Sequence, residues 1–245
     1  MKYNETPPCN ALKDNIHSFW ELKGEEKDGQ WERIFPDGCP GLVINLGDAR
    51  KTDSGLVTMK NGKTYIVGAM TSFKDNFIDS NTHLLGVCMK PATINLFFNY
   101  LEQSEIINQT VQLDKKLSFD FYKLIKNPIS YLNRFFLDRM NRNFHPLHHV
   151  LNDIEKSMGR ESIYDVSKRN GFSVRQLQRH FKHYIGLSPK EYSNIIRFQN
   201  AMKAIKQTDE NRSFLDIAFE YGYYDHSHFS NEIKRNTGHS PSQIF

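Results

Sequence analysis

The sequence predicts an α+β protein of two domains, a β-rich amino-terminal part followed by an all-α carboxy-terminal part. Over the first ninety residues, short segments rich in Val, Ile and aromatic residues alternate with turn residues, a pattern typical of a small barrel or sandwich. After Pro91 the apolar residues recur at three- and four-residue steps, the period of a helix face. We therefore expect a small β-barrel or cupin-like sheet with following helices over residues 1–145, and a helical domain over residues 146–245.

The composition is that of a folded protein. Hydrophobic residues make up 38% and charged residues 24% of the 245 residues, which excludes wholesale disorder. No apolar run approaches the roughly eighteen residues that span a bilayer, and the first ten residues lack the hydrophobic segment of a secretory signal. The formal charge of +4 is compatible with a nucleic-acid partner. We expect a cytoplasmic protein that does not associate with membranes.

Turn residues divide the amino-terminal region into predicted strands. We expect strands near residues 31–35, 42–46, 56–60, 64–69, 73–78 and 84–89. The pair Asn61-Gly62 predicts a hairpin between the strands at 57–59 and 65–67, because both turn residues tolerate positive φ.

Two helices are predicted before the domain boundary. The first buries Ile94, Phe97, Phe98 and Leu101 on one face, and the second begins at Pro128, a residue suited to a first helical turn. The apolar stripe of the second helix is assigned to the core, with a dimerisation seam as the alternative. It consists of Ile129, Leu132, Phe135, Phe136 and Met140. The polar stretch over 141–149 marks the boundary.

The last eighty residues contain an internal repeat. Gly171-Phe172 recurs as Gly222-Tyr223 at an offset of 51, and Gly186-x-Ser188-Pro189 recurs as Gly238-x-Ser240-Pro241 at an offset of 52. Each copy has the anatomy of a helix-turn-helix unit, at about residues 162–184 and 213–237. Two copies indicate a duplicated supersecondary unit and not a solenoid.

In the first unit, Ser162 is predicted to cap a short helix, Gly171 to supply the left-handed turn residue, and Ser173 to cap a second helix over 174–184. Leu177 and Phe181 face inward on that helix. The opposite face carries Arg and Gln side chains, which can bond guanine and adenine, and Lys for phosphates. A solvated polar face is the alternative. The position of this face just after a glycine turn, in a unit that occurs twice, favours DNA binding. The predicted contacts are Ser173, Arg175, Gln178, Arg179 and Lys182.

The second unit is predicted to use shorter and less basic side chains. Ser213 and Asp225 are the expected caps, Gly222 the turn residue, and Leu215 and Tyr221 part of the packed face, with Ile217 and Ala218. The predicted contacts are His226, Ser227, Ser230, Asn231 and Lys234. A helix over about 189–206, about 27 Å long at about 1.5 Å per residue, joins the units. It can hold the two recognition helices about 34 Å apart, one DNA turn.

These spaced residues resemble the AraC/XylS family of bacterial transcription regulators. The resemblance covers Ile163, Val166-Ser167, Gly171-Phe172-Ser173, Leu177, Arg179, Phe181-Lys182, Gly186, Ser188-Pro189, Tyr192, Arg197, Ala201, Ile217-Ala218, Gly222-Tyr223, Ser227, Phe229, Lys234, Gly238 and Ser240-Pro241. It implies two helix-turn-helix subdomains joined by a long helix, promoter binding, and most often activation through contact with RNA polymerase. It also implies base-reading roles for Arg175, Gln178 and Arg179 in the first unit, and for Ser227, Ser230 and Asn231 in the second.

The amino-terminal part resembles, more loosely, the β-rich sensor domains attached to such regulators. The similarity lies in Phe19-Trp20-x-Leu22, in Phe35-Pro36-Asp37-Gly38-Cys39 and in residues 42–48. It implies a domain that responds to a small molecule or another signal. Candidate ligand-binding residues are Trp20, Trp31 and Phe35, with an aromatic core as the alternative. A domain that only dimerises is the second interpretation, and a homodimer fits both.

An enzyme is the least favoured function class, and no catalytic residue or cofactor is predicted. A metal-binding cupin needs a His-x-His pair with a Glu and a later His, whereas His17 and His83 stand alone in the β region. His226 and His228 lie two residues apart on a predicted helix, so their side chains diverge.

The cysteines predict neither a disulfide framework nor a zinc site. Cys9, Cys39 and Cys88 lie far apart in the sequence and form no C-x-x-C pair. For Cys39, a buried structural thiol is preferred over a redox-sensing one. The sequence thus predicts no metal site.

Overall fold

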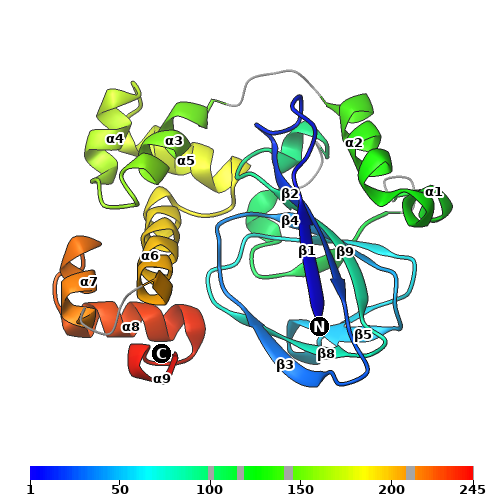
Figure 1. Ribbon diagram of the computed structural model, residues 1–245. Helices are drawn as coiled ribbons and strands as arrows, with labels where there is room; N and C mark the ends of the chain where they lie inside the picture. The colour runs from blue at the N-terminus through cyan, green and yellow to red at the C-terminus, as the bar shows by residue number, and fades with distance from the viewer. Residues whose placement is uncertain (99–101, 115–118, 141–145, 208–212, 245) are drawn as a thin grey trace.

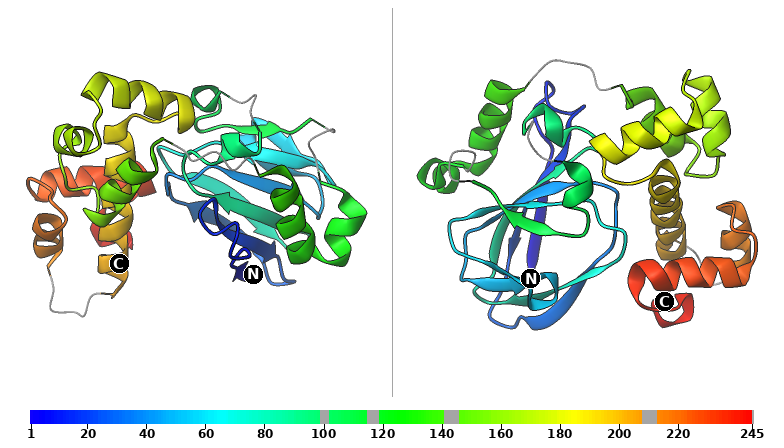
Figure 2. Two further views of the ribbon diagram at one scale, coloured as in Figure 1. Left: turned by 90° about the horizontal axis from the view of Figure 1, so that it is seen from above. Right: turned by 180° about the vertical axis from the view of Figure 1, so that it is seen from behind.

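The computed structural model describes residues 1–98, 102–114, 119–140, 146–207 and 213–244 (Figure 1). A β-rich lobe and a helical lobe lie side by side, as the three views agree (Figures 1 and 2). Within the described ranges, no helix is both long enough and apolar enough to cross a membrane.

The amino-terminal lobe is built on a six-stranded antiparallel sheet in the order β1-β2-β9-β4-β7-β10. Its strands are β1 (Lys2–Thr6), β2 (Ile16–Lys23), β9 (His83–Met89), β4 (Gly41–Asn45), β7 (Thr64–Val67) and β10 (Thr110–Gln112). Two smaller ladders pair β3 (Gly29–Ile34) with β8 (Lys74–Asp79) and β5 (Arg50–Thr52) with β6 (Val57–Met59).

The α+β fold class is confirmed, but the barrel part of the prediction is wrong. The six-stranded sheet is open, and β1 and β10 form its edges. β1 has the polar sequence KYNET and is largely exposed, which suits an edge that faces water better than a strand that closes a barrel.

The alternation of side chains along β4 supplies two apolar clusters. Leu42 and Ile44 point into the main core of the lobe, where Phe136 of α2 (Pro128–Arg139) is also buried. Val43 points to the other face and packs with Tyr65 in a smaller cluster. The prediction that α2 begins at Pro128 and that its apolar stripe belongs to the core is confirmed.

The predicted hairpin at Asn61-Gly62 is wrong, although a turn is present. Gly62 has φ +68°, but β6 pairs with β5 while β7 pairs with β4 and β10. The Gly62 amide donates to the carbonyl of Asn45, and the Asn61 side chain donates to the carbonyls of Leu46 and Gly47. These bonds hold the turn against the end of β4 and direct the two strands into different ladders.

Several elements lie outside the predicted strands and helices. Most are short or polar, namely β1, β5, β10, α1 (Phe121–Lys126) and the 3-10 turns η1 (Asp53–Gly55) and η3 (Gln103–Glu105). β2 was also not predicted, although it has eight residues and a partly buried sequence, IHSFWELK. The helix predicted after Pro91 is the short 3-10 turn η2 (Ile94–Leu96). Ile94, Phe97 and Phe98 are buried as expected, while Leu101 lies outside the described residues.

The carboxy-terminal lobe is helical throughout its described residues, as predicted. Its helices are α3 (His148–Lys156), α4 (Ile163–Arg169), α5 (Val174–Tyr184), α6 (Pro189–Gln207), α7 (Phe214–Glu220), α8 (His226–Thr237) and α9 (Pro241–Ile244). One packing prediction is wrong: Leu215 is 43% exposed, because it sits in the first turn of α7 away from the face of Ile217 and Ala218. The domain boundary predicted at 145/146 borders residues 141–145, which lie outside the described part, and it stays a prediction.

Candidate DNA-binding surface

Local capping builds the first helix-turn-helix unit. The Ser162 hydroxyl accepts from the amide of Asp165 at the start of α4, and Gly171 has φ +71° in the turn. Ser173 and Gln176 then form a reciprocal capping box at the start of α5, which fixes where that helix begins. The predicted caps, turn residue and helix bounds of this unit are confirmed.

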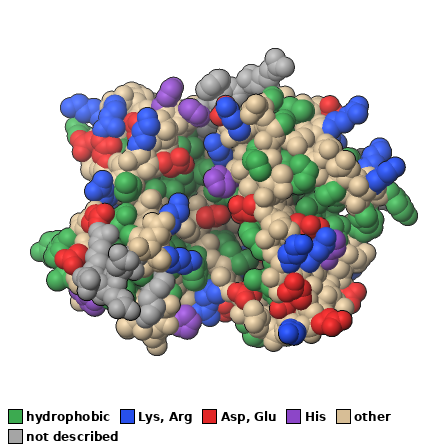
Figure 3. All heavy atoms as spheres, in the orientation of Figure 1, with side chains coloured by type: hydrophobic (Ala, Val, Ile, Leu, Met, Phe, Trp, Pro, Cys, Tyr) green, Lys and Arg blue, Asp and Glu red, His purple; other side chains and the backbone are tan. Residues whose placement is uncertain are grey.

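The helix α5 presents its polar face to solvent. Leu177 and Phe181 are fully buried beneath it. All the side chains predicted to contact DNA in this unit are exposed, namely Ser173, Arg175, Gln178, Arg179 and Lys182. The Lys182 ammonium donates to the carbonyl of Gly186, which ties it to the end of the helix. Basic side chains gather over α4 and α5 on the face shown in Figure 3.

The second unit repeats this construction. The Asp225 carboxylate accepts from the amide of His228 at the start of α8, and Phe229 and Ile233 are buried beneath the helix. Gly238 ends it in the left-handed region. Of the predicted contacts, His226, Ser227, Asn231 and Lys234 are exposed, and Ser230 is half-buried.

The long helix α6 separates the two units. Its nineteen residues correspond to about 28 Å, and α5 and α8 lie at its two ends and run in the same direction across Figure 1. The buried guanidinium of Arg197 braces the second unit, since it donates to the carbonyl of Gly222 and lies 4.6 Å from the centroid of the Tyr223 ring.

The carboxyl ends of both recognition helices rest on the β-rich lobe. A Cβ at Gly186, after α5, would lie 2.5 Å from the Gln103 carbonyl oxygen. After α8, the Arg33 guanidinium donates to the carbonyl of Thr237 over 2.7 Å, and a Cβ at Gly238 would lie 2.8 Å from the Phe73 ring. These contacts between the β-rich lobe and the two helices all lie at the carboxyl ends of α5 and α8, whereas in this motif the amino-terminal part of the second helix reaches base edges.

The loop between β3 and β4 provides the central contact between the lobes. The Phe35 ring meets the Phe198 ring edge-on at 6.2 Å, and the Gln199 amide donates to the carbonyl of Pro36. Gly38 lies so close to Tyr192 that a Cβ there would be 2.8 Å from the tyrosine ring. Contacts with one loop of the β-rich lobe therefore extend over about two turns of α6, from Tyr192 to Gln199, beside the hollow between the lobes (Figure 3).

A small cavity lies against the sheet of the β-rich lobe. It has a volume of about 160 Å³ and is lined mostly by apolar side chains, with Arg50 and Lys74 among the polar ones. Of the residues predicted to bind a ligand, Trp20 lines it. Trp31 is instead 68% exposed, and Phe35 packs at the interface with Phe198.

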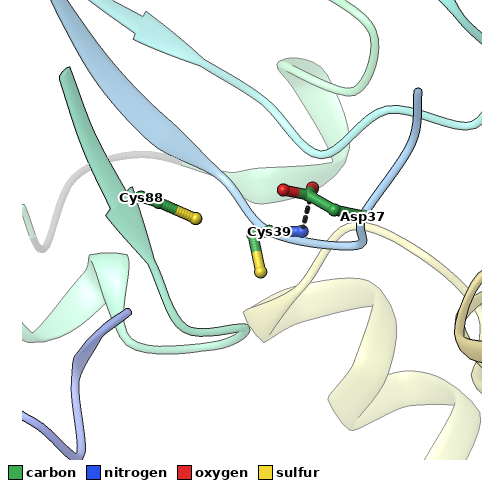
Figure 4. Close-up of side chains that lie close together, drawn as sticks. All are labelled: Asp37, Cys39 and Cys88. Carbon is green, nitrogen blue, oxygen red and sulfur yellow. Dashed lines mark hydrogen bonds between the residues drawn. The ribbon is translucent and has the colours of Figure 1, made fainter. Parts of the chain in front are cut away.

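The structure also brings together groups that the sequence separates. A carboxylate oxygen of Asp37 and the sulfurs of Cys39 and Cys88 all lie within 4.8 Å of one another (Figure 4). The prediction treated the cysteines as isolated because 48 residues separate Cys39 from Cys88. The signal available in the sequence was the Asp-Gly-Cys turn directly before a strand; the pairing of β4 with β9 was not.

Comparison with known protein families divides the chain in the same way. Residues 4–112 match a family described as a domain of unknown function (DUF6597). Residues 166–245 match the helix-turn-helix domain family, which takes in both α5 and α8.

Curated relatives match the carboxy-terminal part. The transcriptional activator RhaS of Enterobacter sp. (strain 638) is 37% identical over 84 residues, 34% of this chain and 28% of that protein. RhaS of Klebsiella pneumoniae is 33% identical over 40% of this chain and 35% of its own length. The transcriptional regulator MtrA of Neisseria gonorrhoeae is 32% identical over 39% and 31%. The chain thus spans about a third or less of these relatives.

Solved structures share the whole two-lobe arrangement. An apo ToxT variant from Vibrio cholerae superposes with a TM-score of 0.52 at 13% identity, over 92% of this chain and 96% of that one. A second ToxT structure gives 0.52 at 12% identity, over 100% and 98%. At such identity the likeness concerns the fold. The sequence matches show a helix-turn-helix domain of the AraC type at the carboxyl end of this chain and a domain of unknown function at its amino end.

Proposed function

We propose that the protein is a sequence-specific DNA-binding transcription regulator that reads two adjacent major-groove segments. The observation that carries this proposal is the pair of capped helices, α5 and α8, held at opposite ends of α6 with polar side chains exposed on both. The first unit supplies Arg175, Gln178 and Arg179 for base edges, and the second supplies the shorter Ser227 and Asn231. We therefore assign most of the sequence discrimination to α5.

DNA selection followed by affinity measurement tests this assignment. Sites would first be selected from random DNA with the full chain, and binding to the preferred site would then be measured by fluorescence anisotropy. Arg179→Ala should weaken binding by about 1–3 kcal/mol and relax preference at one base position. The matched control is Arg134→Ala, which removes an 84% exposed arginine of α2 in the other lobe.

Unchanged affinity of Arg179→Ala on the selected site would remove this residue from the reading surface. Equal losses for Arg134→Ala and Arg179→Ala would show that only the overall charge matters. Affinity for the site should also fall as salt rises, because phosphate contacts release counterions. A selected site much shorter than two half-sites would contradict reading by both units.

We assign the amino-terminal lobe the control of this activity by a small molecule. Because it contacts the carboxyl ends of both recognition helices and the middle of α6, a change in the lobe alters their relative placement. The cavity of about 160 Å³ beside Trp20 is the proposed site. It is below the usual 300–1,000 Å³ of ligand pockets, so it suits a small effector. One ToxT structure of related fold was solved with (E)-4-(8-methylnaphthalen-1-yl)but-3-enoic acid, so carboxylic acids belong in a first screen.

Tryptophan fluorescence gives a site-specific test of the effector. The chain has two tryptophans, and Trp31 is exposed on β3. Trp31→Phe therefore leaves Trp20, at the cavity, as the single reporter. An effector should shift the emission of this variant saturably and change its affinity for the selected DNA. A screen in which no compound does so, together with constitutive promoter activity of the full chain, would favour the alternative in which the lobe only dimerises.

The remaining roles follow from the relatives. RhaS proteins are named transcriptional activators, so we propose activation through contact with RNA polymerase, in the cytoplasm where bacterial promoters are found. A reporter gene behind the selected site should gain transcription when the protein is present; repression would reverse this assignment. A homodimer is compatible with this proposed function, and sedimentation at several protein concentrations tests whether the chain forms one. The curated relatives are regulators, and we propose no catalytic activity.

A further inference from the structure

Two segments with carboxylate and thiol side chains meet where the β3–β4 loop approaches β9. In the loop, the Asp37 carboxylate accepts from the amide of Cys39 over 2.9 Å, and Gly38 adopts φ +76° between them. On β9, Cys88 faces Gly41 of β4 in the strand register. The turn and the strand pairing therefore fix the positions of all three side chains, independently of any ligand (Figure 4).

The donor atoms of this cluster and the charges around it suit a cation. The Asp37 carboxylate places negative charge beside the Cys39 and Cys88 sulfurs. Both cysteines are half-buried, whereas the Asp37 side chain is exposed. Glu155 adds further negative charge from α3. These groups repel a further anion and favour a cation.

We propose that Asp37, Cys39 and Cys88 bind a thiophilic divalent metal ion such as Zn²⁺ or Cd²⁺. Two sulfurs and one carboxylate oxygen are ligands that zinc takes and that Mg²⁺ and Ca²⁺ do not. With bonds of about 2.0–2.3 Å in a tetrahedral site, ligand atoms lie about 3.3–3.8 Å apart. The three groups, now within 4.8 Å, need to close by about 1–1.5 Å at most. On binding, the ion replaces the two thiol protons, which pass to solvent, and one coordination position stays open.

The position of this site gives the metal a route to the DNA-binding domain. The loop that carries Asp37 and Cys39 also holds the contacts of Gly38 with Tyr192 and of Pro36 with Gln199 on α6. The Tyr192 hydroxyl in turn donates to Glu155 over 2.9 Å. Any adjustment of the loop around an ion is therefore passed to α6. Asp37, Cys39 and Cys88 also line the cavity assigned to a small effector under the proposed function. The metal site rests on the geometry of its three ligands and not on the identity of that effector.

Cadmium titration of the reduced full chain, without DNA, tests the site. Cd²⁺ bound to thiolates gives an ultraviolet charge-transfer band, which should saturate at one ion per chain. Cys39→Ser and Cys88→Ser should each abolish the stoichiometric band or weaken binding beyond the roughly 10–100-fold that outer-shell changes cost. The matched control is Cys9→Ser, because Cys9 is the third free and half-buried cysteine and lies outside the cluster. It should leave the titration unchanged.

Alkylation of the unmodified protein provides a second measurement in case a serine variant fails to fold. Cd²⁺ should protect Cys39 and Cys88 from iodoacetamide, as read by mass spectrometry of peptides, and should leave Cys9 reactive. The proposal is overturned if the band is absent, if it persists in both serine variants, or if all three cysteines alkylate equally with and without the ion. A Cys39–Cys88 disulfide in a protein that binds no Cd²⁺ after reduction would overturn it as well. None of these outcomes bears on DNA binding.

Discussion

Replacing Gly238 with Ala should loosen the contact between the β-rich lobe and the second recognition helix. Gly238 has φ +78°, so an alanine there costs about 1–2 kcal/mol of left-handed strain. Its Cβ would also lie 2.6 Å from Nη1 of Arg33 and 2.8 Å from the Phe73 ring. Arg33 can swing aside, but it then gives up its bond to the carbonyl of Thr237. A hydrogen bond from a charged donor contributes about 1.5–3 kcal/mol, so the total loss is about 2.5–5 kcal/mol.

Gly171→Ala separates these two costs. Gly171 also has positive φ, at +71°, but nothing lies within 4 Å of a Cβ there, so only the strain of about 1–2 kcal/mol applies. Urea unfolding of the full chain by circular dichroism gives both values. Hydrogen exchange at 31–36 and 72–76 should accelerate in Gly238→Ala alone. Equal stability losses and unchanged exchange in the two variants would refute the argument that Arg33 and Phe73 hold α8.

Three further substitutions test the packing of the helical lobe. Phe181→Ala should lower the free energy of unfolding by about 3–5 kcal/mol, because its ring is fully buried beneath α5; a urea midpoint equal to that of the parent would contradict this burial. Leu215→Ala should cost less than about 1 kcal/mol in the same experiment, since the side chain is 43% exposed, and a loss as large as that of Phe181→Ala would place Leu215 in the core after all. Ser173→Ala should cost about 1 kcal/mol by removing the acceptor of the Gln176 amide at the start of α5, and an unchanged melting temperature would show that this cap is dispensable.

Local rules account for the parts of the helical lobe that the sequence predicted. A cap such as Ser173, a glycine such as Gly171 and an apolar stripe such as Leu177 with Phe181 all act within a few residues of one another. Their pattern therefore survives in the linear sequence, and the bounds of α5 follow from it. The prediction for Leu215 was wrong because it rested on the apolar character of the side chain. The residue lies in the first turn of α7, away from the face that buries Ile217 and Ala218.

The β-rich lobe was predicted less completely for the opposite reason. Strand partners come from distant parts of the chain, as in the pairing of β2 with β9 and of β4 with both β7 and β9. The turn at Asn61-Gly62 is a correct local prediction, but the choice of partner for each strand rests on contacts with Asn45 and Leu46. A polar edge strand such as β1 carries no apolar alternation that would reveal it.

The sequence by itself determined that the chain ends in two capped helix-turn-helix units and which polar side chains their second helices expose, because capping, turn geometry and helical period are local. Only the tertiary structure decided that the β-rich lobe meets the carboxyl ends of both recognition helices, and that Cys39 and Cys88 share one cluster with Asp37. Both depend on contacts between segments tens to hundreds of residues apart, and such contacts are selected by the packing of the whole fold.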